Sequence, residues 1–142
     1  MNCLLDTNVV SEARRRDPNP GFAAWWDRVS AGQLYLSALT VGELQRGVER
    51  VRQRGDREQA DALHEWLIRV VHQFADRILP VDAAVAVEWG AQPHNQPIPV
   101  IDGLIAATAT AHGLTLVTRN GRDVERTGVR LHNPFTAEKD GE

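Results

Sequence analysis

The sequence predicts an α/β protein whose central sheet is mostly parallel and covered by helices on both faces. Short apolar runs alternate with segments of helical periodicity along the chain, a pattern typical of parallel sheets. No internal repeat, low-complexity block or linker interrupts the 142 residues, so a single domain is expected. We place that domain at residues 1–135 and a polar C-terminal tail at residues 136–142.

The first half of the chain is expected to contain two strands and four helices. The strands are the buried runs at residues 3–5 and 34–36. Apolar side chains recur at helical spacing in four further segments, so helices are expected at residues 7–16, 22–29, 40–54 and 56–74. Gly55 should end the third of these helices. The fourth carries an apolar stripe of Leu63, Leu67, Val70, Val71 and Phe74.

The second half continues the alternation of strands and helices. Pro80 disfavours helical geometry in the residue before it, so residues 78–81 should be extended. Asp82 should cap an alanine-rich helix that runs through Trp89. The remaining elements are a proline-rich loop at 92–99, a nearly all-apolar helix at 101–112 ended by Gly113, and strands at 115–118 and 129–131.

Composition limits the possible function. Charged residues make up 25% and hydrophobic residues 42%, ordinary values for a soluble globular protein, and no apolar run is long enough to span a membrane. Cys3 is the single cysteine, which excludes an intrachain disulfide and a thiolate metal site. The N-terminus lacks the pattern of a secretion signal, so a cytoplasmic location is expected. A net charge of −3 argues against nonspecific adhesion to nucleic acid.

Acidic and amide side chains follow apolar segments at four places where a strand is expected to give way to a helix. They are Asp6 with Thr7 and Asn8, then Glu43, then Asp102, and finally Asn120 with Asp123. In an open parallel sheet such places lie on one edge, so their side chains can meet in one pocket. Carboxylates brought together repel one another unless a cation lies among them. Because oxygen ligands favour hard ions, the pattern predicts Mg²⁺ or Mn²⁺.

Each of these acids also has a purely structural interpretation. Asp6 and Asp102 could be N-caps, and Thr40 with Glu43 has the spacing of a capping box. If the acids are only caps, the protein is a non-catalytic interaction domain. Asp102 argues against this, because it is the one ionised group of an apolar helix and has no Lys or Arg nearby in sequence. A divalent cation would supply the missing partner.

A hard divalent ion held by carboxylates indicates hydrolysis of a phosphodiester or a phosphomonoester. The sequence contains neither a glycine-rich nucleotide loop nor a nucleophilic serine elbow. A small metal-dependent phosphatase with Asp6 as its nucleophile is the alternative enzyme. That chemistry usually requires a second aspartate two residues on, where this chain has Asn8.

Arginines are the expected contacts for a polyanionic substrate, and the candidates are Arg14, Arg46 and Arg119. The arginine groups around Arg14 and Arg46 could instead be solvated helix faces. For the second group that interpretation is slightly favoured, since Arg46 lies at helix-neighbour spacing from Glu43 and Glu49. The four tryptophans fall on expected helices, and we interpret them as core residues.

Four segments of the chain together resemble the PIN-domain ribonucleases. In the order of that family they are residues 4–12 (Leu4-Leu5-Asp6-Thr7-Asn8-Val9-Val10-Ser11-Glu12), 40–44, 101–109 and 116–120. The likeness is greatest to the VapC toxins of bacterial toxin–antitoxin pairs, and among them to the FitB-like group, whose ending the Asn133-Pro134-Phe135 segment resembles. The resemblance covers nearly the whole chain.

This resemblance implies a three-layer α/β/α PIN-like domain that cuts RNA with Mg²⁺ or Mn²⁺. It makes Asp6, Glu43 and Asp102 the principal metal-binding and catalytic acids, with Thr7, Asn8 and Thr118 orienting them. Asn120 stands where many relatives carry aspartate, and Asp123 follows three residues later as a further acid. The resemblance also implies a small VapB-like antitoxin as partner in a heterocomplex, a homodimer, and no association with a membrane.

Overall fold

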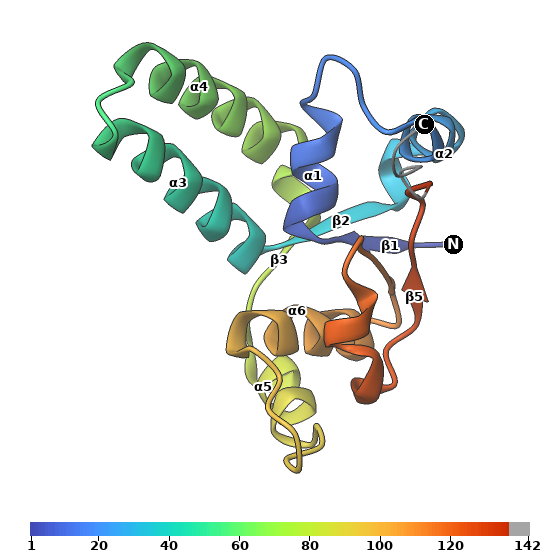
Figure 1. Ribbon diagram of the computed structural model, residues 1–142. Helices are drawn as coiled ribbons and strands as arrows, with labels where there is room; N and C mark the ends of the chain where they lie inside the picture. Colours follow the sequence, from blue (N-terminus) through green and yellow to red (C-terminus); the bar gives the residue numbers. More distant parts are fainter. Residues whose placement is uncertain (137–142) are drawn as a thin grey trace, which may run out of the picture.

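A five-stranded, wholly parallel sheet forms the centre of the computed structural model, which describes residues 1–136 (Figure 1). Its strand order is β3-β2-β1-β4-β5, with Cys3 of β1 paired to Leu34 of β2 and to Thr115 of β4. The strands are β1 (Cys3–Leu5), β2 (Leu34–Ser37), β3 (Ile78–Leu79), β4 (Thr115–Val117) and β5 (Leu131–His132). The predicted parallel α/β architecture is therefore confirmed.

Helices connect these strands and cover both faces of the sheet. They are α1 (Thr7–Ala13), α2 (Pro20–Arg28), α3 (Ala38–Gln53), α4 (Arg57–Gln73), α5 (Ala83–Gly90) and α6 (Val100–Ala111). Short 3₁₀ turns lie at Ala31–Gln33, Ala75–Arg77, Gly121–Asp123 and Glu125–Thr127. Figure 1 shows α1 to α4 on one side of the sheet and α5 with α6 on the other, which gives three layers.

The two faces of the sheet carry different cores because side chains alternate along each strand. Cys3 and Leu5 of β1 face the first core, which α1 to α4 cover with residues such as Phe22 and Val48. Leu4, between them in sequence, faces the second core together with Ile105 of α6. All six of these side chains are at most 1% exposed, so the short strand β1 is buried on both faces.

Helix ends differ from the prediction by a few residues at several places. Helix α1 ends at Ala13 and not at residue 16, and α3 begins at Ala38, two residues before the expected Thr40. The last strand is Leu131–His132 and not residues 129–131. Gly55 and Gly113 stop α3 and α6 as predicted, and both adopt positive φ angles, 91° and 65°, that favour glycine.

The chain topology places a switch point beside β1. The chain proceeds from β1 to β2 and β3 on one side, whereas β4 and β5 lie on the other side of β1. In open α/β sheets, ligands bind outside the carboxyl ends of the strands at such a point. The carboxyl ends of β1 and β4 lead directly into Asp6 and Thr118, so the topology itself directs these two residues to a binding crevice.

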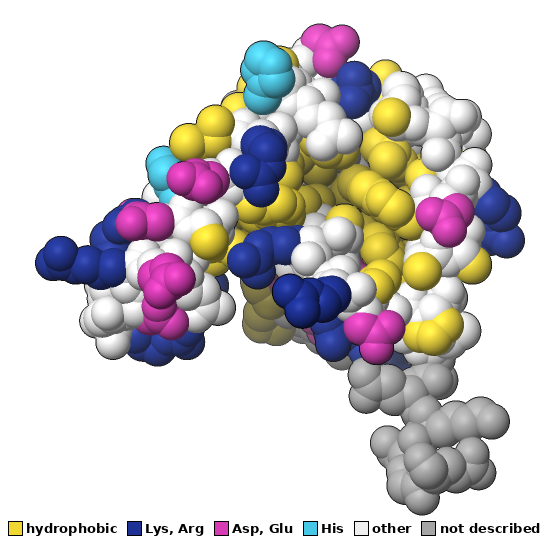
Figure 2. Space-filling model, turned by 90° about the horizontal axis from the view of Figure 1, so that it is seen from above, with side chains coloured by type: hydrophobic (Ala, Val, Ile, Leu, Met, Phe, Trp, Pro, Cys, Tyr) yellow, Lys and Arg dark blue, Asp and Glu magenta, His cyan; other side chains and the backbone are white. Residues whose placement is uncertain are grey.

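The face that carries α1 and α4 is hollowed, with hydrophobic side chains on its floor and basic side chains at its edge (Figure 2).

Trp89 of α5 is 42% exposed, so its interpretation as a core residue is wrong, whereas Trp25 is buried. Within residues 1–136, no helix is long and apolar enough to cross a membrane. Thr136, the first residue of the predicted tail, hydrogen-bonds Asn19; residues 137–142 lie outside the described part of the chain.

Candidate functional site

Asp6 lies at the end of β1 and caps helix α1. The backbone N–H of Thr7 donates to Asp6 Oδ1 (2.8 Å), and the hydroxyl of Thr118 donates to Asp6 Oδ2 (2.7 Å). Thr118 is 1% exposed, so this second bond is held inside the protein. The two donors fix the carboxylate in one orientation and leave lone pairs on both oxygens for a further ligand.

Glu43 reaches the same region from the second turn of α3. The hydroxyl of Thr7 donates to Glu43 Oε1 (2.5 Å) and lies 3.4 Å from the buried hydroxyl of Thr40. The N-cap of α3 is Ser37, whose Oγ accepts from the N–H of Leu39 (3.0 Å). The capping-box interpretation of Thr40 and Glu43 is therefore wrong, and the Glu43 carboxylate has no capping role.

Asp102 lies in the first turn of α6, after a proline-rich loop. The N-cap position of this helix is Pro99, which has no side chain to cap it, so Asp102 is not an N-cap. The sequence pattern predicted that Asp102 follows a strand. It does not, because Val100 already belongs to helix α6. Among residues 1–136, no basic side chain forms an ion pair with Asp102, as the sequence argument expected.

The pKa of the Asp102 carboxyl group depends on burial and on the acids around it. Burial raises the pKa of its carboxyl group above the usual range, and the negative charges of Asp6, Glu43 and Asp123 raise it further. Each of these three acids comes from a different part of the chain. Their combined effect on one pKa therefore indicates that the four carboxylates share a single region of negative potential.

The fourth part of the site is the segment after β4. The N–H of Asn120 donates to Thr118 Oγ1 (3.1 Å), which links this segment to the residue that holds Asp6. Asp123 follows in a 3₁₀ turn. Asn8 of α1 accepts from the backbone N–H of Arg119 (3.3 Å), so its amide joins the start of α1 to the segment after β4.

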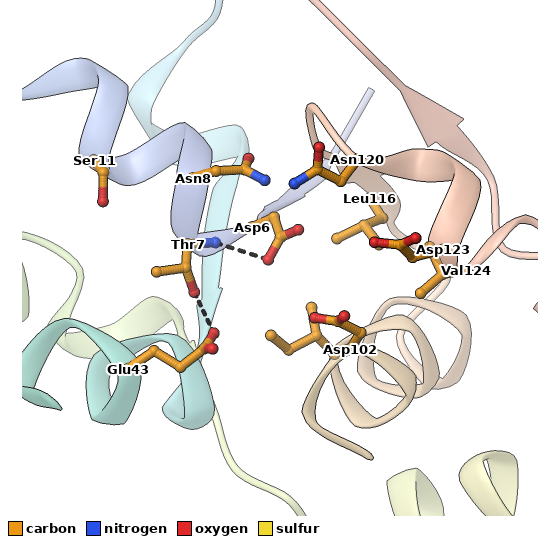
Figure 3. Close-up of a pocket in the computed structure, with 11 residues that line it drawn as sticks. Asp6, Thr7, Asn8, Ser11, Glu43, Asp102, Leu116, Asn120, Asp123 and Val124 are labelled. Carbon is orange, nitrogen blue, oxygen red and sulfur yellow. Dashed lines mark hydrogen bonds between the residues drawn. The ribbon is translucent and has the colours of Figure 1, made fainter. Parts of the chain in front are cut away.

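These residues line one cavity of about 270 Å³. Figure 3 shows the carboxylates of Asp6, Asp102 and Asp123 pointing into it from three directions, with Glu43 at its side. The predicted residues on its wall are Asp6, Thr7, Asn8, Glu43, Asp102, Asn120 and Asp123; Thr118 is not part of the wall and supports Asp6 through its hydroxyl. The sequence thus predicted residues that the fold brings together.

Four wall residues were missed by the sequence analysis. They are Ser11, Ile105, Leu116 and Val124. Ser11 could have been found, since it lies one helical turn after Thr7 and Asn8 on the same face of α1. The apolar three gave no chemical signal, because their patterns are those of any core residue.

The donor set fits a hard divalent cation. Carboxylate and amide oxygens are the ligands that Mg²⁺ and Mn²⁺ prefer, and the chain provides them around the cavity without a compensating basic residue. As the side chains stand in residues 1–136, no group of three acidic, histidine or cysteine side chains is close enough to hold a metal ion. An ion here would therefore be held by fewer direct carboxylates and by waters between it and the others, as is usual for Mg²⁺.

The three predicted substrate-binding arginines lie in different places. Arg14 borders a second cavity, which shares Thr7 and Glu43 with the acidic one. Arg46 is exposed and borders neither cavity. The guanidinium of Arg119 lies over the ring of Phe135 (4.8 Å), and its side chain borders a different cavity near Pro20.

Comparison with known proteins places this geometry in a family. The profile of the PIN domain matches residues 3–129. The chain is 40% identical to toxin FitB of Neisseria gonorrhoeae over 138 residues, which cover 93% of this chain and 97% of that protein. It is 34% identical to VapC ribonuclease Y4jK of Sinorhizobium fredii, covering 93% of this chain and 96% of that protein.

A solved structure supports the same relationship. The structure of FitAB bound to an IR36 DNA fragment contains a chain 36% identical to this one, with a TM-score of 0.85. The match covers 97% of this chain and 99% of that chain. The chain therefore belongs to the PIN-domain family, and its close homologues are the FitB and VapC toxins of toxin–antitoxin systems.

Proposed function

We propose that this protein is an endoribonuclease that hydrolyses RNA phosphodiester bonds at its acidic cavity, with a divalent metal ion held by Asp6, Glu43 and Asp102. One observation carries the proposal: four carboxylates from separate elements face one cavity, and no basic side chain of residues 1–136 forms an ion pair with Asp102. An enzyme that binds a polyanion in such a cavity needs a cation there, because carboxylates alone repel phosphate. The names of the FitB and VapC relatives support the choice of toxin and ribonuclease.

The side chains around the acidic cavity have different roles. When bound, Mg²⁺ or Mn²⁺ polarises a phosphate and lowers the pKa of a bound water. Asp6 and Glu43 are held in place for the ion by Thr7 and Thr118, in the way that hydrogen-bonded partners usually orient metal carboxylates. Asn120 offers a neutral oxygen at the rim, and Asp123 offers a further carboxylate.

We further propose that the protein is the toxin of a type II toxin–antitoxin pair and acts in the cytoplasm. Its partner would be a small antitoxin that covers the cavity and silences the nuclease. A homodimer and a heterocomplex with the antitoxin are the assemblies expected by likeness to the family. Homologues named FitB and VapC support this proposal.

The two alternatives are less well supported. A phosphatase with Asp6 as nucleophile would need an acid at position 8, and the Asn8 amide is already engaged with the backbone of Arg119. An interaction domain with acids that only cap helices accounts for Asp6, but Glu43 and Asp102 cap no helix. The nuclease is the function that gives all three acids a role.

The Asp102→Asn variant tests the proposal. It removes one negative charge and keeps the shape of the side chain, so the fold should persist while Mg²⁺-dependent cleavage of RNA falls by at least about a hundredfold, more than for loss of a supporting hydrogen bond. Cleavage of total RNA by wild type and variant, with and without EDTA, measures this. A second measurement is the melting temperature, which Mn²⁺ should raise in wild type and not in the variant. Undiminished cleavage by the variant, or by wild type in EDTA, would contradict the proposal.

A further inference from the structure

A second cavity opens beside the acidic one. Its volume is about 180 Å³, and it shares Thr7, Ser11 and Glu43 with the acidic cavity, so the two cavities are neighbours. Beyond these shared residues its wall is formed by α1, α3 and α4. We call this second cavity the groove. The residues that border the groove and not the acidic cavity are Arg14, Leu44, Gly47, Arg50, Leu63 and Trp66.

The groove combines an apolar floor with two cations. The guanidinium of Arg14 lies over the ring of Trp66 (5.8 Å), which holds it at the groove without using its N–H donors. Within residues 1–136, neither Arg14 nor Arg50 forms an ion pair, although Arg15, Arg52 and Arg77 all do. Two cations that form no ion pair within the described residues therefore border a cavity that adjoins the carboxylates.

Gly47 keeps the floor of this groove open. It lies in the interior of α3, where glycine costs about 1 kcal/mol relative to alanine. A Cβ atom there would meet only the guanidinium of Arg50, at 3.9 Å, so close packing of the protein does not require glycine. The same face of the helix carries Glu43 and Leu44 one turn earlier and Arg50 one turn later, whereas Gly42 and Arg46 border neither cavity.

From this adjacency and charge we infer that the groove binds the nucleotide of a single-stranded RNA next to the phosphate that is cut, an inference that rests on the proposed function. Arg14 and Arg50 contact the phosphates that flank the cut, since guanidinium groups suit phosphate oxygens. The apolar floor receives the base, in the way that single-strand-binding proteins combine basic grooves with aromatic and apolar platforms. The acidic cavity then holds the phosphate that reacts.

RNA binding without cleavage tests the groove directly. The full chain is titrated with a fluorescein-labelled, 12-nucleotide, mixed-sequence single-stranded RNA in Ca²⁺, a hard ion that also prefers oxygen ligands, and a gel confirms that the RNA stays intact. Anisotropy gives the dissociation constant at several salt concentrations. Arg50→Gln should weaken binding by fivefold or more and lower the salt slope by about 0.7, the change expected for one lost phosphate contact on a single strand. Arg54→Gln, the same change one turn later at the end of α3, where the side chain is exposed and borders neither cavity, should stay within twofold of wild type.

A second pair of variants tests the space in the groove. Gly47→Leu should keep or raise the melting temperature, because leucine is the better helix former, yet weaken RNA binding by about tenfold by filling the floor. Gly42→Leu has the same helix benefit and borders neither cavity, so it should leave the RNA affinity unchanged. Circular dichroism and melting temperature confirm that all four variants are folded.

The outcomes separate this inference from the proposed function. If wild type cleaves RNA while Arg50→Gln and Gly47→Leu bind RNA as wild type does, the groove inference is overturned and the groove is assigned to a protein segment. If metal-dependent cleavage is absent but the two variants still weaken binding relative to their controls, the groove inference stands and the nuclease proposal fails. Wild type that does not bind the RNA overturns the inference.

Discussion

The end of β1 and the first turn of α6 each bring an aspartate to the acidic cavity, but in opposite structural circumstances. Asp6 accepts hydrogen bonds from Thr7 and Thr118 and caps α1, so the fold gains from its charge. Asp102 caps nothing, forms no ion pair in residues 1–136, and has a pKa raised by burial and by its acidic neighbours. An acid that the fold does not need is the better indicator of function, because structure alone does not explain it.

Among changes that leave the acids themselves in place, the largest effect should come from removing the hydroxyl that orients Asp6. Thr118→Val keeps the buried volume and deletes the donor to Asp6 Oδ2, so Mn²⁺ affinity or RNA cleavage should fall by about 10–100-fold. Thr115→Val in β4, the strand that ends just before Thr118, is the matched control, since it is the Thr118 hydroxyl that donates to Asp6. Thr118→Ser, which restores a hydroxyl, should recover most of the loss. Equal activity in both valine variants would show that the bond to Asp6 does not matter.

The contrast between the two aspartates can be measured as stability changes of opposite sign. In EDTA at pH 7, Asp6→Ala should destabilise the protein by about 1–3 kcal/mol, because it removes a cap and leaves the buried Thr118 hydroxyl without its acceptor. Asp102→Asn should instead raise the melting temperature, because it deletes a charge that burial and three acids disfavour. Urea unfolding and thermal melts of both variants measure this, and a loss of stability in Asp102→Asn would break the comparison.

The gain in Asp102→Asn should also depend on pH in a defined direction. A raised pKa means that the folded protein binds this proton more tightly than the unfolded chain, so ionisation of Asp102 costs stability. That cost is absent below the ordinary carboxyl pKa near 4 and complete above the raised pKa. The advantage of the variant should therefore grow as pH rises through this interval and vanish at lower pH. Melting temperatures from pH 3 to 8 in EDTA follow it.

Sequence reasoning found the acids but placed one of them, Asp102, after the wrong kind of element. The pattern of acids at four expected strand ends placed Asp102 after a strand, whereas it lies in the first turn of a helix that follows a loop. Convergence was still predicted correctly, because the parallel topology brings α6 and the strand ends to the same edge of the sheet. The types of side chain were enough to predict that the acids meet, whereas the secondary structure just before Asp102 was not predicted correctly.

What the sequence could not supply was the space between elements. Arg14, Arg46 and Arg119 are equal as sequence features, yet only Arg14 borders the groove beside the acids. Arg50 was not among the expected contacts, because helix spacing shows which residues share a face but not what that face meets. Gly47 gave no signal, since its meaning depends on the two other helices that form the groove.

The smallest changes in stability concern α3, where the true cap and the acid can be separated. Ser37→Ala removes the hydroxyl that accepts from Leu39 N–H and should cost about 1 kcal/mol, with RNA cleavage retained. Glu43→Gln keeps that cap, so its unfolding free energy should stay within about 0.5 kcal/mol of wild type while cleavage is lost. Chemical denaturation and cleavage assays on the same preparations give both numbers. If Glu43→Gln lost stability like a missing cap and still cleaved RNA, Glu43 would be structural after all, and Asp6 and Asp102 would have to hold an ion without it.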